Sequence, residues 1–101
     1  MTFDDVRRIM ASFEGCEEST WYRTPSFKKG KVSLVRLKED GETLVVKVDH
    51  DEKEALLQSG SDVYCTTPHY DGYPAILVRL PLIEEAELAD LLELSVRINA
   101  P

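Results

Sequence analysis

The sequence predicts a two-layer α+β domain, in which a mostly antiparallel five-stranded sheet carries its helices on one face. Three observations predict this class. Apolar and polar residues alternate in segments 43–48 and 75–80, as in half-buried strands. Apolar residues recur at helical spacing near both ends of the chain. The connections are short, which favours hairpins over long crossovers. At 101 residues, the chain is expected to form a single domain over 1–101.

The expected order of elements is α-β-β-β-α-β-β-α. A first helix, capped by Thr2 and ended by Gly15, is expected to bury one arc of side chains: Phe3, Val6, Ile9, Met10 and Phe13. Segments 20–24 and 26–28 are expected to be short extended pieces broken at Pro25. Segments 31–38 and 43–48 form the clearest hairpin, and its turn is Glu39-Asp40-Gly41-Glu42.

The second half of the chain repeats this alternation. Asp49 is expected to cap a helix that runs to Gln58 and buries Leu56 and Leu57. Segments 63–66 and 75–80 are the last two strands, and a helix over 84–98 follows them. Strand periodicity puts one set of side chains against the helices: Leu44, Val46, Val48, Ile76, Val78 and Leu80. Lys47 and Arg79 are then expected on the open face of the sheet.

Charge is unevenly distributed along the chain. The net charge of −7 argues against tight nonspecific binding to nucleic acid. However, the segment from Arg23 to Lys47 holds seven basic and three acidic residues, a net of +4. The remainder holds five basic and sixteen acidic residues, a net of −11. A basic sheet beside acidic helices is therefore expected.

The same composition bears on location and assembly. No apolar run approaches the roughly 20 residues that span a bilayer, and the first residues lack the pattern of a signal peptide. A cytoplasmic protein with no membrane partner is expected, as a monomer or weak homodimer. Cys16 and Cys65 lack metal-site spacing and are expected to be free thiols, Cys16 in a loop and Cys65 buried at a strand end.

The most distinctive segment is Thr67-Pro68-His69-Tyr70-Asp71-Gly72-Tyr73-Pro74. Each proline fixes its own φ and extends the residue before it. Asp71-Gly72 predicts a reversal in which Gly72 adopts a positive φ. Turn formation does not require His69, Tyr70 or Tyr73, so these side chains either pack the loop or face a partner. The sequence leaves both interpretations open.

Cationic and aromatic side chains suggest a binding surface on the open sheet face. The candidate binding residues are Lys28, Lys31, Arg36, Lys47, His69, Tyr70, Tyr73 and Arg79. The cations suit an anionic partner, and the tyrosines, with Trp21 and Tyr22, offer faces for stacking. A solvated sheet face with cross-strand Lys–Glu pairs would explain the same charges.

No catalytic or metal-ligating residue is predicted, and no cofactor is expected. His69 and Cys65 could act as base and nucleophile, with Asp71 orienting the imidazole, but no oxyanion-hole signature accompanies them. A histidine that bonds the loop backbone beside a buried thiol is the preferred interpretation. His69 and Asp71 supply at most two of the three or four ligands that a metal site needs. His50 is expected on the surface.

Four segments, taken in order, resemble the MmcQ/YjbR-like family. They are Thr24-Pro25-Ser26-Phe27-Lys28 with Gly30-Lys31, Leu44 to Asp49 leading into Glu54 to Leu57, the loop 67–74 with Val78-Arg79-Leu80, and the stretch from Val96 to Pro101. The resemblance covers essentially the whole chain. One departure is Val96, where the family often has a tryptophan before the arginine of the last helix; it implies different core packing.

The resemblance implies a two-layer fold like that of type III secretion chaperones. It also brings the label of a DNA-binding protein, proposed for the family from a double-wing-like arrangement of hairpins. Three hypotheses follow. The first is a non-catalytic binding module for DNA or another anionic partner. The second is a protein-interaction or chaperone-like adaptor, and the third is an enzyme that acts on a small molecule through the loop 67–74.

Overall fold

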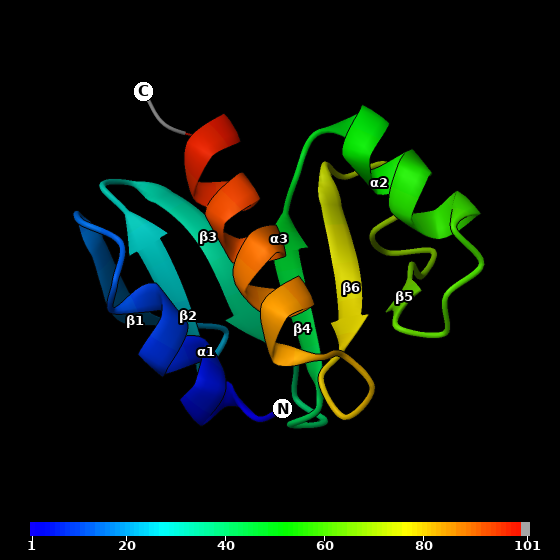
Figure 1. Ribbon diagram of the computed structural model, residues 1–101. Helices are drawn as coiled ribbons and strands as arrows, with labels where there is room; N and C mark the ends of the chain where they lie inside the picture. Colours follow the sequence, from blue (N-terminus) through cyan, green and yellow to red (C-terminus); the bar gives the residue numbers. More distant parts are fainter. Residues whose placement is uncertain (100–101) are drawn as a thin grey trace.

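Six antiparallel strands form one sheet, in the order β1-β2-β3-β4-β6-β5 (Figure 1). The computed structural model describes residues 1–99, so Ala100 and Pro101 of the last resembling segment lie outside the described residues. The strands are β1 (Cys16–Trp21), β2 (Thr24–Lys29), β3 (Val32–Leu37), β4 (Thr43–Lys47), β5 (Tyr64–Cys65) and β6 (Ala75–Arg79). The helices are α1 (Phe3–Met10), α2 (His50–Gln58) and α3 (Glu85–Ile98). The predicted α+β class is confirmed.

The main core lies between one face of the sheet and the helices. In Figure 1, α1 and α3 run across the same face of the sheet, while α2 lies beside β6. The alternation predicted for β4 and β6 is confirmed, because the side chains assigned to the helix side are all buried in this core: Leu44, Val46, Val48, Ile76, Val78 and Leu80. Each fully buried Val, Leu or Ile contributes about 1.5–3 kcal/mol of transfer free energy. A smaller cluster of Val45, Ala75 and Leu77 lies on the opposite face.

The sheet has one strand more than the five predicted. The segment expected as two extended pieces broken at Pro25, residues 20–28, holds the end of β1, the turn that follows it and most of β2, and β1 and β2 pair as a hairpin. Its turn, Tyr22-Arg23, places two residues other than glycine at positive φ, 54° and 67°. No Asn-Gly or Asp-Gly pair marked this turn in the sequence. Pro25 does not break β2, because the pairing of β2 with β3 begins only at Ser26.

A β-bulge interrupts the pairing between β2 and β3. Phe27 lies opposite Val35 and Lys28 lies opposite Ser33, so Leu34 is the extra residue on β3. As a result, both Leu34 and Val35 are buried in the main core, although they are consecutive in a strand. A bulge increases the local twist, and this one lies between the N-terminal hairpin and the rest of the sheet.

The first helix is shorter than expected. It ends at Met10, and residues 11–15 form turns in which Gly15 has a φ of 82°. Phe13 still packs against the core from this turn.

The predicted turn between β3 and β4 is confirmed, with Gly41 at a φ of 73°. The carboxylate of Asp40 accepts hydrogen bonds from the backbone N–H groups of Glu42 and Thr43, at 2.9 Å each, and these bonds lower its pKa.

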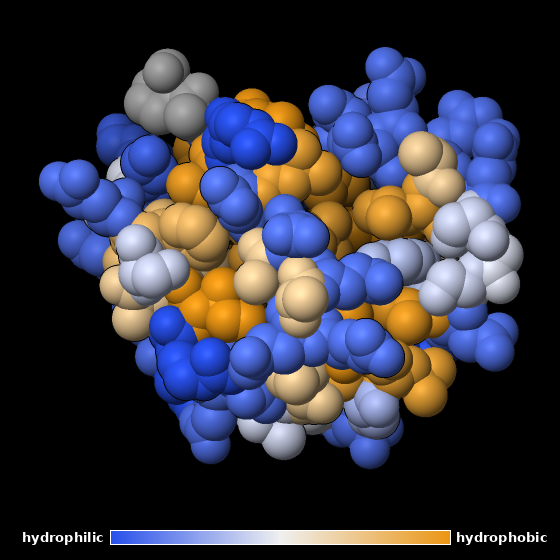
Figure 2. Space-filling view, viewed as in Figure 1, coloured by the Kyte–Doolittle hydropathy of each residue, from blue (hydrophilic) through white to orange (hydrophobic). Residues whose placement is uncertain are grey.

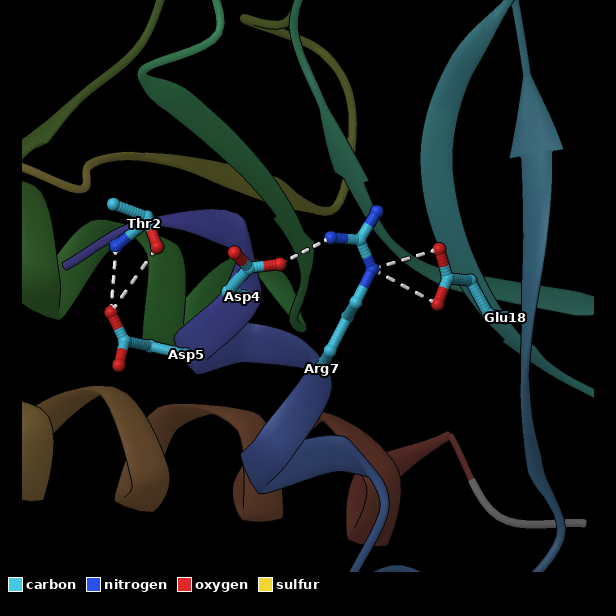
Figure 3. A network of polar contacts seen from close by, with 5 residues as sticks. All are labelled: Thr2, Asp4, Asp5, Arg7 and Glu18. Carbon is cyan, nitrogen blue, oxygen red and sulfur yellow. Dashed lines mark hydrogen bonds and ion pairs between the residues drawn. The ribbon is translucent and has the colours of Figure 1, made fainter.

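Polar contacts join α1 to the edge of the sheet (Figure 3). The guanidinium of Arg7 lies between the carboxylates of Asp4, at 2.5 Å, and of Glu18 on β1, at 3.0 Å. At the start of the helix, the backbone N–H of Thr2 donates to the Asp5 carboxylate at 2.8 Å. These side chains are largely exposed, so the ion pairs are expected to add little to the stability of the fold. Their role is to orient β1 relative to the helix layer.

The helix layer is the acidic side of the molecule. Figure 2, which views this side, shows hydrophilic residues over α2 and apolar surface between α2 and α3. Seven acidic residues lie in α2 and α3, four of them in the first turns: Asp51, Glu52, Glu54, Glu85, Glu87, Asp90 and Glu93. Among residues 1–99, the helices lack the combination of length and apolar sequence that a membrane crossing requires.

Three hydrogen bonds hold α3 and its C-terminal cap residue, Asn99, on the sheet. The hydroxyl of Tyr64 donates to the Glu87 carboxylate at 2.5 Å, and burial together with this carboxylate raises the pKa of Tyr64. Near the other end of the helix, the hydroxyl of the fully buried Ser95 donates to the backbone carbonyl of Lys47 at 2.5 Å. Asn99 donates to the same carbonyl at 3.3 Å. The end of β4 is therefore held directly by α3.

The second helix buries a lysine where leucines were expected. Leu57 is 36% exposed and Leu56 is only partly buried, whereas Lys53 is 5% exposed. The ammonium of Lys53 donates to the carbonyl oxygens of Tyr70 and Tyr73, the latter at 2.8 Å. Burial lowers the pKa of Lys53, and the nearby Asp71 partly offsets this effect. The prediction for α2 was wrong because this side of the helix packs on the backbone of the loop 67–74. The ammonium of Lys53 can donate hydrogen bonds to the carbonyl groups there, and an apolar side chain could not.

Relief of the strained turn should stabilise the fold. Replacement Arg23→Gly is expected to raise the free energy of unfolding by about 1 kcal/mol, because a left-handed conformation costs other residues roughly 1–2 kcal/mol and glycine entropy offsets part of the gain. Chemical denaturation followed by circular dichroism measures the change. Arg23→Ala removes the same charge but keeps Cβ, and is expected to stay within about 0.5 kcal/mol of the parent. Equal effects of the two replacements would contradict strain as the cause.

Loss of the Lys53 ammonium should loosen the loop 67–74. Lys53→Met keeps an apolar stem but removes the donor, and is expected to cost about 1–2 kcal/mol of stability. Hydrogen exchange at the backbone amides of residues 70–75 is expected to accelerate more than exchange in α3. The exposed Lys31→Met serves as the control and should change neither quantity. Unchanged exchange in the loop of Lys53→Met would contradict its role as the anchor.

Candidate functional site

The open face of the sheet has an apolar centre with one buried cation. A continuous row of paired residues crosses all six strands on this face: Ser19, Ser26, Arg36, Val45, Leu77 and Cys65. Arg36 is 7% exposed, and Val45 and Leu77 beside it form the smaller apolar cluster. Arg36 is the one cation in this row, so the other cations expected on this face lie beside the row and not in it.

The loop 67–74 folds over that apolar cluster. Two consecutive turns shape it, in which Tyr70 N–H donates to the Thr67 carbonyl at 2.9 Å and Tyr73 N–H donates to the Tyr70 carbonyl at 3.0 Å. Gly72 does not adopt the positive φ that was predicted, because these turns provide the reversal without it. Tyr70 packs against the cluster of Val45, Ala75 and Leu77. Packing thus explains Tyr70, while Tyr73 remains 56% exposed.

Five aromatic rings gather where the loop approaches the N-terminal hairpin. The imidazole of His69 lies 4.8 Å from the Tyr70 ring, edge to face, and 5.9 Å from the Tyr73 ring, stacked. On the hairpin, the rings of Trp21 and Tyr22 stack at 5.4 Å. The Tyr22 ring also lies over the Arg36 guanidinium at 5.3 Å, a cation–π contact. Tyr22 belongs to the turn with positive φ, so the β1–β2 hairpin carries this ring to Arg36.

A hollow of about 190 Å³ lies between the loop and the hairpin. The rings of Trp21, Tyr22, His69, Tyr70 and Tyr73 line it, together with Arg36 and Lys47. A second, more open depression adjoins it and is lined by Lys28, Lys31, Lys47 and the hydroxyl side chains of Ser19, Thr20, Ser26 and Ser33. Trp21, Ser33 and Lys47 border both. The two depressions therefore form one surface with an aromatic part and a cationic part.

The cations of this surface differ in their partners. Arg36 donates from Nη2 to the Glu39 carboxylate at 2.6 Å and from Nη1 to the Tyr70 hydroxyl at 3.4 Å, while its buried Nε has no partner among residues 1–99. In that same part of the chain, Lys28, Lys31 and Lys47 form no ion pair. Glu17 lies opposite Lys28 in the strand register but forms no ion pair with it. The lysines are thus available to an anion, whereas Arg36 is already largely neutralised.

Seven of the eight candidate residues line this surface, and Arg79 does not. Arg79 is paired with Thr43, four residues along β6 from the site-lining Ala75. Its Nη1 donates to the backbone carbonyl of Asp62. Strand alternation does put Arg79 on the same face as Ala75, but at the opposite end of the strand.

The groups considered for catalysis are not joined to one another. The Asp71 carboxylate accepts from the Thr66 hydroxyl at 3.3 Å, and no hydrogen bond within residues 1–99 links His69 to Cys65 or Asp71. Both cysteines are free thiols; Cys16 lies in β1 rather than in a loop, and both are partly buried. Among the described residues, no three His, Cys, Asp or Glu side chains are grouped so that they could hold a metal ion.

Two parts of the site differ from the prediction made from the sequence. Trp21 and Tyr22 were considered as stacking faces, but the hairpin that brings them to Arg36 was not predicted. Lys53, which anchors the loop, was missed entirely. A signal for Lys53 was present, because it precedes Leu56 and Leu57 by three and four residues and so shares their side of α2.

Comparisons with known proteins agree with this fold. The model of the YjbR family matches residues 11–98. Uncharacterized proteins from Mycobacterium tuberculosis and Mycobacterium bovis are each 35% identical to this chain, over 99% of its length and 89% of theirs. The crystal structure of a Deinococcus radiodurans protein with a DUF419 domain superposes with a TM-score of 0.79 at 23% identity, covering 96% of this chain and 77% of that one. The chain belongs to the YjbR family.

Proposed function

We propose that this chain is a non-catalytic binding module whose open sheet face takes an anionic partner, with DNA as the candidate. The observation that carries the proposal is the surface formed by the two adjoining depressions. Three lysines without ion-pair partners in residues 1–99, Lys28, Lys31 and Lys47, border it beside exposed aromatic rings. Cationic contacts to phosphate beside stacking platforms are the usual means of binding nucleic acid strands.

The net charge of −7 does not contradict this proposal. The acidic residues of α2 and α3 belong to the helix layer, whereas the lysines lie on the opposite face of the sheet. At physiological ionic strength, charges separated by more than about 8 Å are largely screened. The local cations therefore dominate what a ligand meets at the surface. The acidic remainder is expected to keep the affinity moderate and sensitive to salt.

The arrangement of His69 supports a non-catalytic role. Its ring contacts are with Tyr70 and Tyr73, and the carboxylate that could orient it, Asp71, is bonded to Thr66. A nucleophile needs a base within hydrogen-bond reach, and the described residues provide no such pair for Cys65. These contacts make His69 one wall of the hollow.

A second candidate is a protein-interaction adaptor, favoured by the hairpin β1–β2. Strand β1 is an edge strand; Trp21 at its end is 47% exposed, and Tyr22 in the turn that follows is 69% exposed. Aromatic side chains are frequent hot spots of protein interfaces, and an edge strand can pair with an added strand.

Neutralisation of single lysines should weaken DNA binding. Lys28→Gln and Lys47→Gln are each expected to reduce the affinity for a labelled oligonucleotide several-fold at low salt, because each removes one phosphate contact. Fluorescence anisotropy measures the affinity. Lys38→Gln, a lysine outside both depressions, is the control. With about three phosphate contacts, the logarithm of the affinity should fall with the logarithm of salt at a slope of about −2. Absence of binding at low salt would remove nucleic acid as the partner.

Removal of a nearby negative charge should have the opposite effect. Glu17 lies opposite Lys28 in the strand register and competes there with a phosphate. Glu17→Gln is therefore expected to increase the affinity for the oligonucleotide by about two- to fivefold at low salt. Glu93→Gln makes the same charge change on α3 and should have little effect. Equal gains from both variants would indicate a dependence on net charge alone, and would argue against this face as the site.

The adaptor candidate has its own test. Strand addition at β1 would make the chain self-associate or bind an extended peptide. Thr20 lies opposite Pro25, one position from the two-residue turn, so its backbone N–H faces the free edge of the sheet and not β2. Thr20→Pro would therefore remove a donor from that edge and leave the β1–β2 hydrogen bonds in place. Sedimentation of the parent and the variant over a range of concentrations distinguishes the cases. A dimer of the parent that Thr20→Pro abolishes would support the adaptor. A monomer at every concentration counts against self-association through this edge.

A further inference from the structure

We infer that the surface binds a single-stranded segment of nucleic acid and holds one unpaired base in the aromatic hollow. This inference rests on the proposed function and specifies the ligand of the same site. It divides the surface into a base site, lined by the five rings and Arg36, and a phosphate site, lined by Lys28, Lys31 and Lys47.

The size of the hollow limits what can enter it. Pockets for drug-sized ligands are commonly about 300–1,000 Å³, whereas this hollow is about 190 Å³. A single planar ring system therefore suits it better than a complete dinucleotide cofactor. A duplex keeps its bases stacked inside, so a base can reach such a hollow only from a single strand or after extrusion.

The rings present faces and edges that suit an aromatic guest. Trp21, Tyr22 and Tyr73 are each about half exposed or more, so part of each ring can contact a ligand. They come from two separate parts of the fold, the β1–β2 turn and the loop 67–74, and still meet at one hollow. Stacking of a base between such rings requires no particular base edge, so we expect little dependence on sequence.

The distribution of charge indicates which part of the ligand binds in each depression. Inside the hollow, the Arg36 guanidinium already bonds the Glu39 carboxylate and lies under the Tyr22 ring. It therefore has less charge to offer a phosphate, but can still face the polar edge of a base. The three lysines without ion-pair partners in residues 1–99 border the adjoining depression. With the charges arranged in this way, the ring of the bound base is expected to enter the hollow, and the sugar–phosphate backbone is expected to lie along the lysines of the adjoining depression.

The spread of the lysines favours a strand over a free nucleotide. Lys28 lies on β2, Lys31 in the β2–β3 turn and Lys47 at the end of β4, so they lie on different parts of the sheet. A mononucleotide has one phosphate group, whereas a strand offers successive phosphates to successive lysines. Trp21 and Ser33 connect the two depressions, so a strand can pass from one to the other.

The test compares ligands that share phosphates but differ in bases. The probes are a labelled oligothymidylate of about ten nucleotides, an abasic oligonucleotide of equal length, and the duplex of the first with its complement. We expect oligothymidylate to bind about tenfold more tightly than the abasic strand and more tightly than the duplex. Binding should also change the fluorescence of Trp21, the chain's one tryptophan. Anisotropy at low salt measures the affinities.

Variants of the residues that line the hollow test whether the preference for oligothymidylate over the abasic strand arises there. Tyr73→Leu and Tyr22→Leu are expected to remove most of the preference for oligothymidylate over the abasic strand, while Tyr73→Phe, which keeps the ring, should retain it. Lys28→Gln should weaken both strands by the same factor. Circular dichroism and the unfolding midpoint establish that each variant is folded; if one leucine variant is not, the other remains informative.

The outcomes separate this inference from the proposed function. Equal affinity for the oligothymidylate, the abasic strand and the duplex would overturn the base site but leave an anion-binding face. No binding of any probe would overturn both. A preference for oligothymidylate that survives both leucine variants would place the base elsewhere and overturn the inference. Displacement of the strand by thymidine monophosphate at an equal molar concentration would identify a free nucleotide, and not a strand, as the occupant.

Discussion

The contact between the Lys53 ammonium and the backbone of the loop 67–74 is the interaction on which the candidate site depends. The loop contains two prolines and no regular secondary structure, so few backbone bonds of its own hold it against the sheet. Lys53 supplies a donor to the carbonyls of Tyr70 and Tyr73 from a helix that is itself capped by the Asp49 side chain. With the backbone fixed there, Tyr70 covers the small apolar cluster and Tyr73 faces the hollow. A charged group in a buried position thus has a positioning role that no apolar side chain could perform.

Much of the fold could be predicted from the sequence because strong local patterns determined it. The alternation in β4 and β6, the Asp40-Gly41 turn and the limits of α3 follow from periodicity and turn chemistry, and all agree with the structure. The errors occurred where tertiary contacts override local preference. The turn at Tyr22-Arg23 contains neither glycine nor asparagine, so nothing in the sequence marked a sixth strand. On α2, the burial of Lys53 is favourable only because distant carbonyls meet it.

The candidate site was predicted in composition but not in arrangement. The cations and tyrosines had been recognised as a set, yet their division into an aromatic hollow and a lysine-lined depression depends on the sheet register and on the bulge at Leu34. Arg79 shows what periodicity cannot predict. Alternation placed Arg79 on the correct face of the sheet, but it could not show that Arg79 lies at the end of β6 that is far from the site. Trp21 and Tyr22 line the hollow because the hairpin of β1 and β2 places them there, and this hairpin was not predicted.

The bulge between β2 and β3 also means that the two walls of the hollow are attached to the fold in different ways. The loop wall is tied to α2 by the hydrogen bonds of Lys53, whereas the hairpin wall is attached to the sheet through an interrupted ladder and has a free edge at β1. The hairpin is also joined to the helix layer, because Phe27 of β2 is buried in the main core and its ring stacks on the ring of Phe3 in α1 at 5.9 Å. The distance between the two walls therefore depends on two helices that do not line the hollow: α2 holds the loop, and α1 holds the hairpin.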